Sequence, residues 1–113
     1  MYKLIALFTN PADAPAFETR WAGEFVPLAE KMPGLRRAVV SRIDGTPSGP
    51  SPYYMVHELY FDDKETLLAA MASAEGAAAG QNLMDFAAKD VTLLLAEHLE
   101  DENLKSQNPN PKL

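Results

Sequence analysis

The chain has 113 residues, of which 47% are hydrophobic and 23% charged, a balance typical of one globular domain with a real core. The formal net charge of −6 argues against nucleic-acid binding, because phosphate contacts need clustered Lys and Arg. Cysteine is absent, which excludes disulfides and thiolate metal sites, and no apolar run reaches the roughly 20 residues of a membrane span. We therefore expect a cytoplasmic protein without membrane contact.

The first predicted element is a strand over residues 2–8, "YKLIALF", whose nearly continuous apolar character is typical of a strand buried on both faces. A helix should follow, with Asp13 as its N-cap and Pro15 in its first turn, where the missing N–H costs nothing. Four apolar residues then recur at helical spacing: Phe17, Trp21, Phe25 and Leu28.

Pro27 interrupts this helical pattern. It cannot donate to the carbonyl of Gly23, and its ring presses on the same turn. We therefore expect the helix to kink or restart near Val26, with glycine at position 23 easing the strain.

Two more strands are predicted before the next helix. Residues 35–43 follow a Pro-Gly turn and are rich in β-branched residues, and residues 53–61, "YYMVHELYF", form the strongest strand pattern of the chain. Asp62 and Glu65 then have the spacing of a capping box, which predicts the start of a helix.

The following segment is rich in alanine, which we interpret as close helix packing. Ser73 and Gly76 predict its division into two helical pieces. Residues 90–99, "DVTLLLAEHL", predict the last strand. One domain over residues 1–99 therefore precedes a polar tail, residues 100–113, expected to be disordered or to pack across a dimer.

The order β-α-β-β-α-β predicts an α+β, ferredoxin-like fold, with a four-stranded antiparallel sheet and both helices on one face. The strands are apolar on both faces, so the face without helices should not meet water. We therefore expect a homodimer through the sheet face, a dimeric α/β barrel whose interior can hold a ligand.

Two segments, "FVPLAEKMPGLRR" and "ELYFDDKETLLAAMASAEG", resemble the EthD family, named for ethyl tert-butyl ether degradation, within the dimeric α/β-barrel superfamily. The resemblance covers about residues 1–88. It implies a homodimeric barrel associated with the breakdown of small xenobiotic or aromatic compounds, and the label oxidoreductase often accompanies the family name.

Many members of the family carry an aromatic residue, three intervening residues, a histidine, one further residue and then Pro-Leu. Here the aromatic place is Trp21, and Pro-Leu is Pro27 and Leu28. The histidine place falls on Phe25, which can neither take nor give a proton. The resemblance therefore leaves open whether this chain is an enzyme.

Among the residues that could do chemistry, His57 shares strand parity with Met55, Leu59 and Phe61, on the face expected to pack on the helices. Its two interpretations are a hydrogen-bonded core histidine and a proton carrier in a pocket. His98 is expected at the surface. No residues have metal-ligand spacing and no phosphate loop is present, so we expect neither a metal nor a cofactor.

Glu58 shares parity with Tyr54 and Tyr60, on the face assigned to the barrel interior. In an apolar cavity its pKa would rise and make it a usable base. The alternative is an ion pair with an arginine of the preceding strand, Arg37 or Arg42, that only holds the sheet or dimer together.

Two functions follow. The first is a binding or accessory protein of a catabolic pathway, whose cavity takes an apolar or aromatic compound through Trp21, Phe25, Tyr54 and Tyr60. Trp21 and Phe25 are equally consistent with ordinary core packing. The second function is a cofactor-independent oxygenase, isomerase or cyclase with Glu58 or His57 as its base. The phenylalanine at position 25 favours the first.

Overall fold

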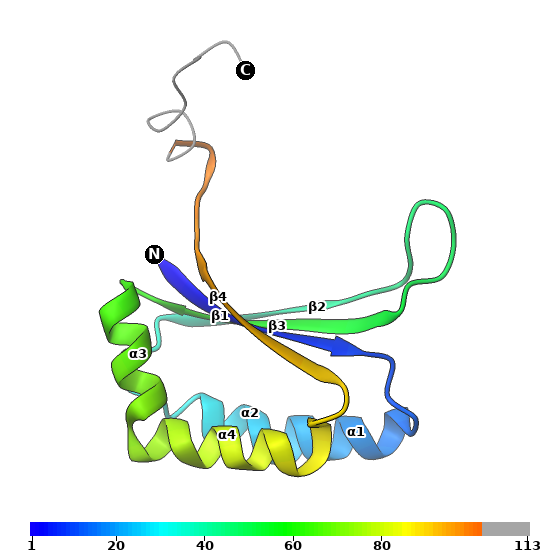
Figure 1. Ribbon diagram of the computed structural model, residues 1–113, viewed down its shortest axis with the longest axis horizontal. Coiled ribbons are helices and arrows are strands. Elements are labelled where there is room, and N and C mark those ends of the chain that lie inside the picture. Colours follow the sequence, from blue (N-terminus) through cyan, green and yellow to red (C-terminus); the bar gives the residue numbers. More distant parts are fainter. Residues whose placement is uncertain (103–113) are drawn as a thin grey trace.

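The fold is an antiparallel sheet with the helices α1 to α4 on one of its faces (Figure 1). The computed structural model describes residues 1–102. The four strands lie in the order β2-β3-β1-β4. Their bounds are β1 (Tyr2–Thr9), β2 (Arg37–Arg42), β3 (Tyr53–Phe61) and β4 (Val91–Glu97). The predicted α+β, ferredoxin-like arrangement is confirmed, and of the predicted tail, residues 103–113 lie outside the described part of the chain.

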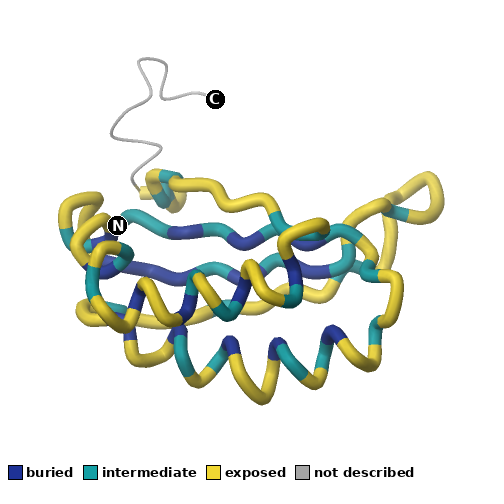
Figure 2. The backbone as a smooth tube through the Cα atoms, turned by 60° about the horizontal axis from the view of Figure 1, so that its bottom comes forward, coloured by how far each residue is buried: buried dark blue, intermediate teal, exposed yellow. Residues whose placement is uncertain are grey.

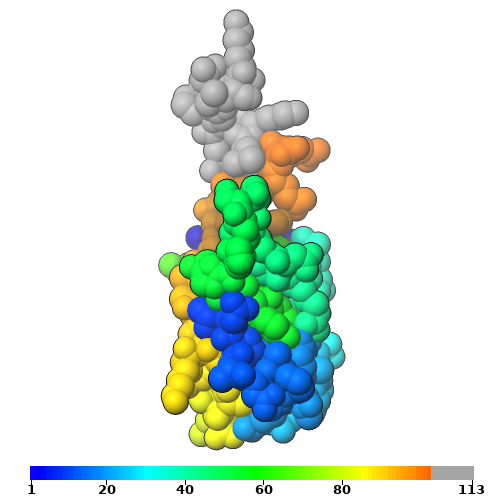
Figure 3. Space-filling view, turned by 90° about the vertical axis from the view of Figure 1, so that its right-hand side faces the viewer, coloured from blue at the N-terminus to red at the C-terminus, as the bar shows by residue number. Residues whose placement is uncertain are grey.

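The helices form a second layer whose inner sides are buried against the sheet (Figure 2). Their bounds are α1 (Ala14–Arg20), η1 (Trp21–Phe25), α2 (Val26–Ala29), α3 (Lys64–Ala72) and α4 (Ala74–Ala87). At one end the loop between β2 and β3 projects above the connection from β1 to α1 (Figure 3). There the Asn10 side chain donates to the carbonyl of Ser51 at 2.9 Å.

The predicted irregularity before Pro27 is a π-helical turn rather than a sharp kink. The N–H of Val26 donates to the carbonyl of Trp21, five residues back, and α-helical bonding resumes from Val26. A π turn contains more residues than an α turn, so it offsets the drift of side chains spaced four apart. Phe17, Trp21 and Phe25 therefore all stay buried on the inner side of the helix layer.

Capping aspartates set the first residues of α1 and α3, and the cap predicted for α3 is corrected. Asp13 caps α1 by accepting from the N–H of Ala16, as predicted. Asp63, and not Asp62, caps α3 by accepting from the N–H of Thr66 at 2.8 Å. Asp62 instead pairs with Arg36 at 2.7 Å across the exposed surface, so the predicted capping box is wrong.

Side chains alternate between the two faces of the sheet, and this decides which residues can reach the helices. The face toward the helices carries Leu4, Ala6, Phe8, Met55, His57, Leu59 and Phe61, which are all buried. The other face, called here the open face, has no helix over it in the described part of the chain. It carries Lys3, Ile5, Leu7, Val39, Val56, Glu58, Tyr60 and Leu94.

Candidate functional site

A cavity of about 250 Å³ lies between the sheet and the helix layer. Its sheet side comes from β1, β3 and β4, and its helix side from η1, α3, α4 and the segment after α2. The walls are apolar apart from His57 and Gln81. The lining includes Leu4, Leu59 and Leu93 from the strands and Phe25, Met32, Met71 and Leu83 from the helix layer.

The cavity exists because α4 presents small residues where its inner side crosses the sheet. A Cβ placed on Gly80 would meet no atom within 4 Å, so this glycine faces open space. The alanine-rich segment predicts close helix packing. Such packing is present at Gly76, where an added Cβ would lie 2.1 Å from the carbonyl oxygen of Ala70. One turn later the same helix leaves a void instead of closing one.

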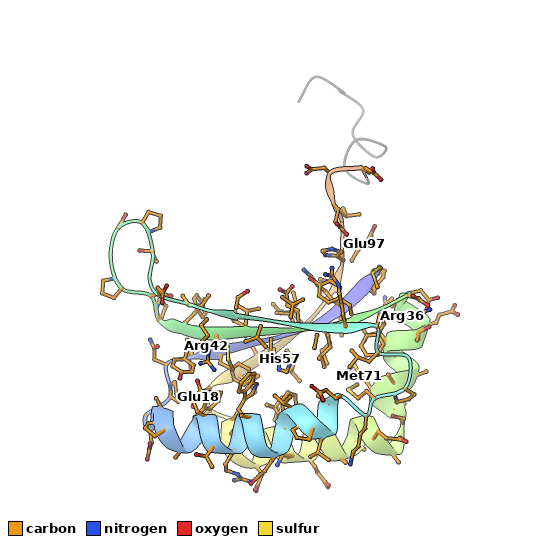
Figure 4. All side chains as sticks on the ribbon, turned by 180° about the vertical axis from the view of Figure 1, so that it is seen from behind. Glu18, Arg36, Arg42, His57, Met71 and Glu97 are labelled. Atoms are coloured by element: carbon orange, nitrogen blue, oxygen red, sulfur yellow. The ribbon has the colours of Figure 1, made fainter. Side chains whose placement is uncertain are left out.

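His57 lies in the middle of β3 and faces the helix layer, as its parity predicted (Figure 4). It is 2% exposed, and its Nδ1 accepts a hydrogen bond from the indole Nε1–H of Trp21 at 3.2 Å. The rings of Trp21 and Phe25 stand edge-on to the imidazole, at 5.4 and 5.7 Å between centroids. Burial lowers the pKa of His57 to about 4, so the imidazole is neutral at pH 7.

Phe25 and Trp21 have different places at this site. Phe25 lines the cavity, where its ring can contact an apolar ligand, as expected from the sequence. Trp21 lies behind His57, holds it by the indole hydrogen bond and belongs to the buried core. Phe25 lines the cavity from η1, and His57 reaches the same cavity from the opposite, sheet side.

Tyr54 does not share the open face with Glu58, which corrects its predicted placement. The pairing of β1 with β3 shifts register between Phe8 and Thr9, at the start of β3. Alternation fails at such an irregularity, and the Tyr54 ring packs edge-on against Phe17 of α1 at 5.6 Å. Its hydroxyl donates to Glu18 at 2.6 Å, outside the cavity lining.

Glu18 joins Tyr54 to the neighbouring strand. Arg42 of β2 forms an ion pair with Glu18, and the two lie together at one end of the sheet (Figure 4). The hydrogen bond from Arg42 holds the pKa of the Glu18 carboxyl below its ordinary value. This cluster ties α1 to the sheet and makes no opening to the cavity.

Glu58 and Tyr60 lie on the open face, away from the cavity. Glu58 pairs with Lys3 of β1 at 2.5 Å, so neither of the two expected arginines is its partner. The Tyr60 ring is 4% exposed and lies under the guanidinium of Arg37, at 4.3 Å. His98 packs edge-on against the same ring at 4.8 Å rather than standing free at the surface.

Sequence reasoning missed the residues that shape the void, Gly80 and Gln81 of α4 and Leu93 of β4. The available signal was the glycine spacing within the alanine-rich segment, where Gly76 and Gly80 are four residues apart. Within residues 1–102, no group of His, Asp and Glu side chains could hold a metal ion, and no helix is long and apolar enough to span a bilayer.

Comparison with known proteins shows the same family along most of the chain. The family model described as EthD domain matches residues 10–90. A curated relative, an uncharacterized 11.0 kDa protein of the thcB–thcC intergenic region of Rhodococcus erythropolis, is 31% identical over 97 residues, covering 86% of this chain and 94% of its own.

Solved structures agree with the fold. An ethyl tert-butyl ether d (EthD) family protein from Bacillus halodurans is 44% identical with a TM-score of 0.85, covering 88% of this chain and 99% of that one. SnoaB, a cofactor-independent oxygenase from Streptomyces nogalater, has a TM-score of 0.65 at 15% identity, covering 88% and 93%. A dimeric ferredoxin-like protein from Thermobifida fusca has a TM-score of 0.63 at 17% identity, covering 86% and 90%. Because the domain model matches most of its length, this chain belongs to the EthD family.

Proposed function

We propose that the protein binds a small apolar or aromatic molecule in the cavity between its sheet and its helices. The observation that carries this proposal is the apolar cavity of about 250 Å³ between sheet and helices, with His57 and Gln81 as its polar side chains. Small ligands bind preferentially in concave, mostly apolar sites with a few polar groups, and a cavity of about 150 Å³ already accepts benzene. A molecule of one or two rings suits the volume.

The cavity has a route to solvent along the sheet edge. Leu93 of the edge strand β4 lines the cavity and is 40% exposed. Opposite it on α4, Ala77 and Gln81 line the cavity and are also exposed. A ligand therefore has an entrance between β4 and α4 that requires no rearrangement of the core.

Binding is favoured over base catalysis by the placement of the two candidate bases. Glu58 lies on the open face and is paired with Lys3. His57 lines the cavity, but its Nδ1 already accepts from Trp21, and burial lowers its pKa to about 4. A base working near neutral pH needs a pKa close to 7 and a free lone pair toward its substrate.

A supporting role in the breakdown of small molecules accords with the family name. In the name of the Bacillus halodurans relative, that family is the ethyl tert-butyl ether d (EthD) family. SnoaB supports only the fold for this chain, because its identity is 15%. We therefore extend the proposal to an accessory protein of a catabolic pathway, which needs no cofactor.

The proposed assembly is a homodimer through the open face. Leu94 is 45% exposed there, beside half-buried Ile5 and Leu7 on β1 and Val56 on β3. Apolar side chains gathered on one sheet face favour burial against a second copy. Structural neighbours such as the Thermobifida fusca protein are described as dimeric.

Ligand binding is tested by filling the cavity from α4. Gly80→Leu places a side chain in the open space beside this glycine, whereas Ala78→Leu adds the same side chain at an exposed position of the same helix. The measurement is the rise in melting temperature with a panel of one- and two-ring compounds. We expect compounds that stabilise the wild type and Ala78→Leu but not Gly80→Leu. An equal response of both variants, or no response of the wild type, would contradict cavity binding.

The dimer is tested by a pair of leucines on opposite faces of β4. Leu94→Glu places a charge on the open face, and Leu95→Glu places one on the helix side at a similarly exposed position, 46%. Sedimentation equilibrium should give a dimer for the wild type and Leu95→Glu and a monomer for Leu94→Glu. Equal masses for the two variants would refute the proposed interface.

A further inference from the structure

The second ring nitrogen of His57 has no role in the core. Nδ1 accepts from Trp21 at 3.2 Å, and no polar atom of the described residues accepts from Nε2. Buried polar groups normally have partners, so an unpartnered donor in a 2% exposed side chain calls for an explanation.

Trp21 fixes which ring nitrogen carries the proton. An indole N–H can only donate, so Nδ1 must be the acceptor. A neutral imidazole has one proton, which therefore resides on Nε2. The side chain of His57 thus offers a hydrogen-bond donor and no acceptor beyond the one that Trp21 uses.

The free donor faces the cavity. Among the side chains of residues 1–102, the one fully enclosed polar atom without a partner is Oδ1 of Asn82, so His57 Nε2 is not sealed in by its neighbours. His57 lines the cavity, and its Nδ1 side is covered by Trp21. The remaining space in front of Nε2 is the cavity itself.

The rest of the lining restricts what can pair with this donor. His57 is the one ionisable side chain there, and the other polar side chain, Gln81, stands at the exposed entrance. An anion would lie buried with no cation beside it, which is unfavourable. A ligand whose polar group only donates would meet a second donor. A neutral oxygen acceptor on an apolar body satisfies both conditions.

We propose that the ligand of this cavity carries an uncharged carbonyl or ether oxygen that accepts a hydrogen bond from His57 Nε2, and that Trp21 is the positioning residue that holds His57 in the donating tautomer. This inference rests on the proposed function, because it names the chemical class that the same cavity selects. A neutral imidazole in this tautomer can also polarise a carbonyl group without transferring its proton.

The first test needs no variant. Acetophenone and α-methylstyrene have nearly the same shape, but one carries C=O where the other carries C=CH₂. Titration calorimetry on the wild-type protein should give acetophenone a dissociation constant about 3- to 10-fold lower, the worth of one neutral hydrogen bond. Equal affinities would overturn the inference and leave the proposed binding function standing. No binding of either compound, together with no response of the wild type to the panel of one- and two-ring compounds, would refute both.

The second test reads the tautomer without a ligand. Long-range ¹H–¹⁵N NMR correlations of the imidazole distinguish a proton on Nε2 from one on Nδ1. We expect the Nε2–H form of His57 in the wild type at pH 7 and a mixture of both forms in Trp21→Phe, which lacks the indole donor. A wild-type proton on Nδ1, or an unchanged tautomer in Trp21→Phe, would overturn the role of Trp21.

A third measurement tests whether the preference for acetophenone comes from the donor of His57. His57→Leu places an apolar side chain without a donor at this position, so the acetophenone carbonyl would be buried without a partner. The preference for acetophenone should therefore be lost or reversed, while α-methylstyrene still binds. A preference that persists in the folded variant would overturn the assignment of His57. Should this variant fail to fold, the wild-type affinity ratio and the tautomer remain decisive.

Discussion

Replacing His57 with glutamine tests the burial of its imidazole through the pH dependence of stability. The pKa of His57 is lowered from 6.5 to about 4 in the folded protein because the side chain is desolvated. Between these values the unfolded chain binds a proton that the folded protein does not. Lowering the pH from 7 therefore favours the unfolded state until the folded pKa is passed.

The size of the effect follows from the same two pKa values. Between pH 7 and pH 5 the folded wild type should lose about 2 kcal/mol through His57, and below pH 4 the loss should level off near about 3 kcal/mol. His57→Gln has no titrating group at this position, and its amide can still accept from Trp21. The variant should therefore lack this part of the pH dependence, whatever its stability at pH 7.

The assay is urea unfolding at pH 5, 6 and 7, at one fixed protein concentration, for the wild type, His57→Gln and His98→Gln. Carboxyls whose pKa is lowered in the folded state also destabilise it as the pH falls. Glu18 beside Arg42 is one of them, and its contribution cancels between wild type and variant. A wild-type slope that survives in His57→Gln, or that disappears equally in His98→Gln, would refute the reasoning.

Further predictions concern the glycines that shape the fold, each measured by urea unfolding. Gly80→Ala should stabilise the protein by about 0.5 to 1 kcal/mol, because alanine favours the helix and the added Cβ meets no atom within 4 Å. Gly76→Ala, one turn earlier, should destabilise it by about 1 to 3 kcal/mol, since the Cβ would lie 2.1 Å from the Ala70 carbonyl oxygen. Gly34→Ala should also destabilise it, because this glycine has φ +82° and a Cβ there would lie 2.6 Å from Thr66. A stability change of the same sign at positions 76 and 80 would contradict the geometry of α4.

Sequence periodicity predicted the elements and placed two candidate site residues, His57 and Phe25, on buried faces, because it reports which face of an element is buried. The period of two in β3 placed His57 on the helix side, and the helical spacing placed Trp21 and Phe25 in the core. The conflict between Pro27 and a continuous helix correctly located the irregularity near Val26, although its π-helical form depends on how η1 packs.

For Tyr54 and Glu58, the cause of the failed prediction lies between strands rather than along one. Tyr54 changes face because the pairing of β1 with β3 shifts at Phe8 and Thr9, which alternation within β3 cannot show. Glu58 meets Lys3 because β3 lies between β2 and β1, so a partner from β1 competes with those from β2. The cavity is a space left by absent side chains at Gly80, and hydrophobic patterns record the side chains that are present.

The most direct test of the central claim is the position of a bound ligand. With acetophenone at saturating concentration and methyl-labelled protein, intermolecular nuclear Overhauser effects should connect the ligand to Leu83 and Leu93, which line the cavity. Ligand contacts with Ile5 and Leu94 instead would place the molecule on the open face between two sheets, and would contradict a site between sheet and helices.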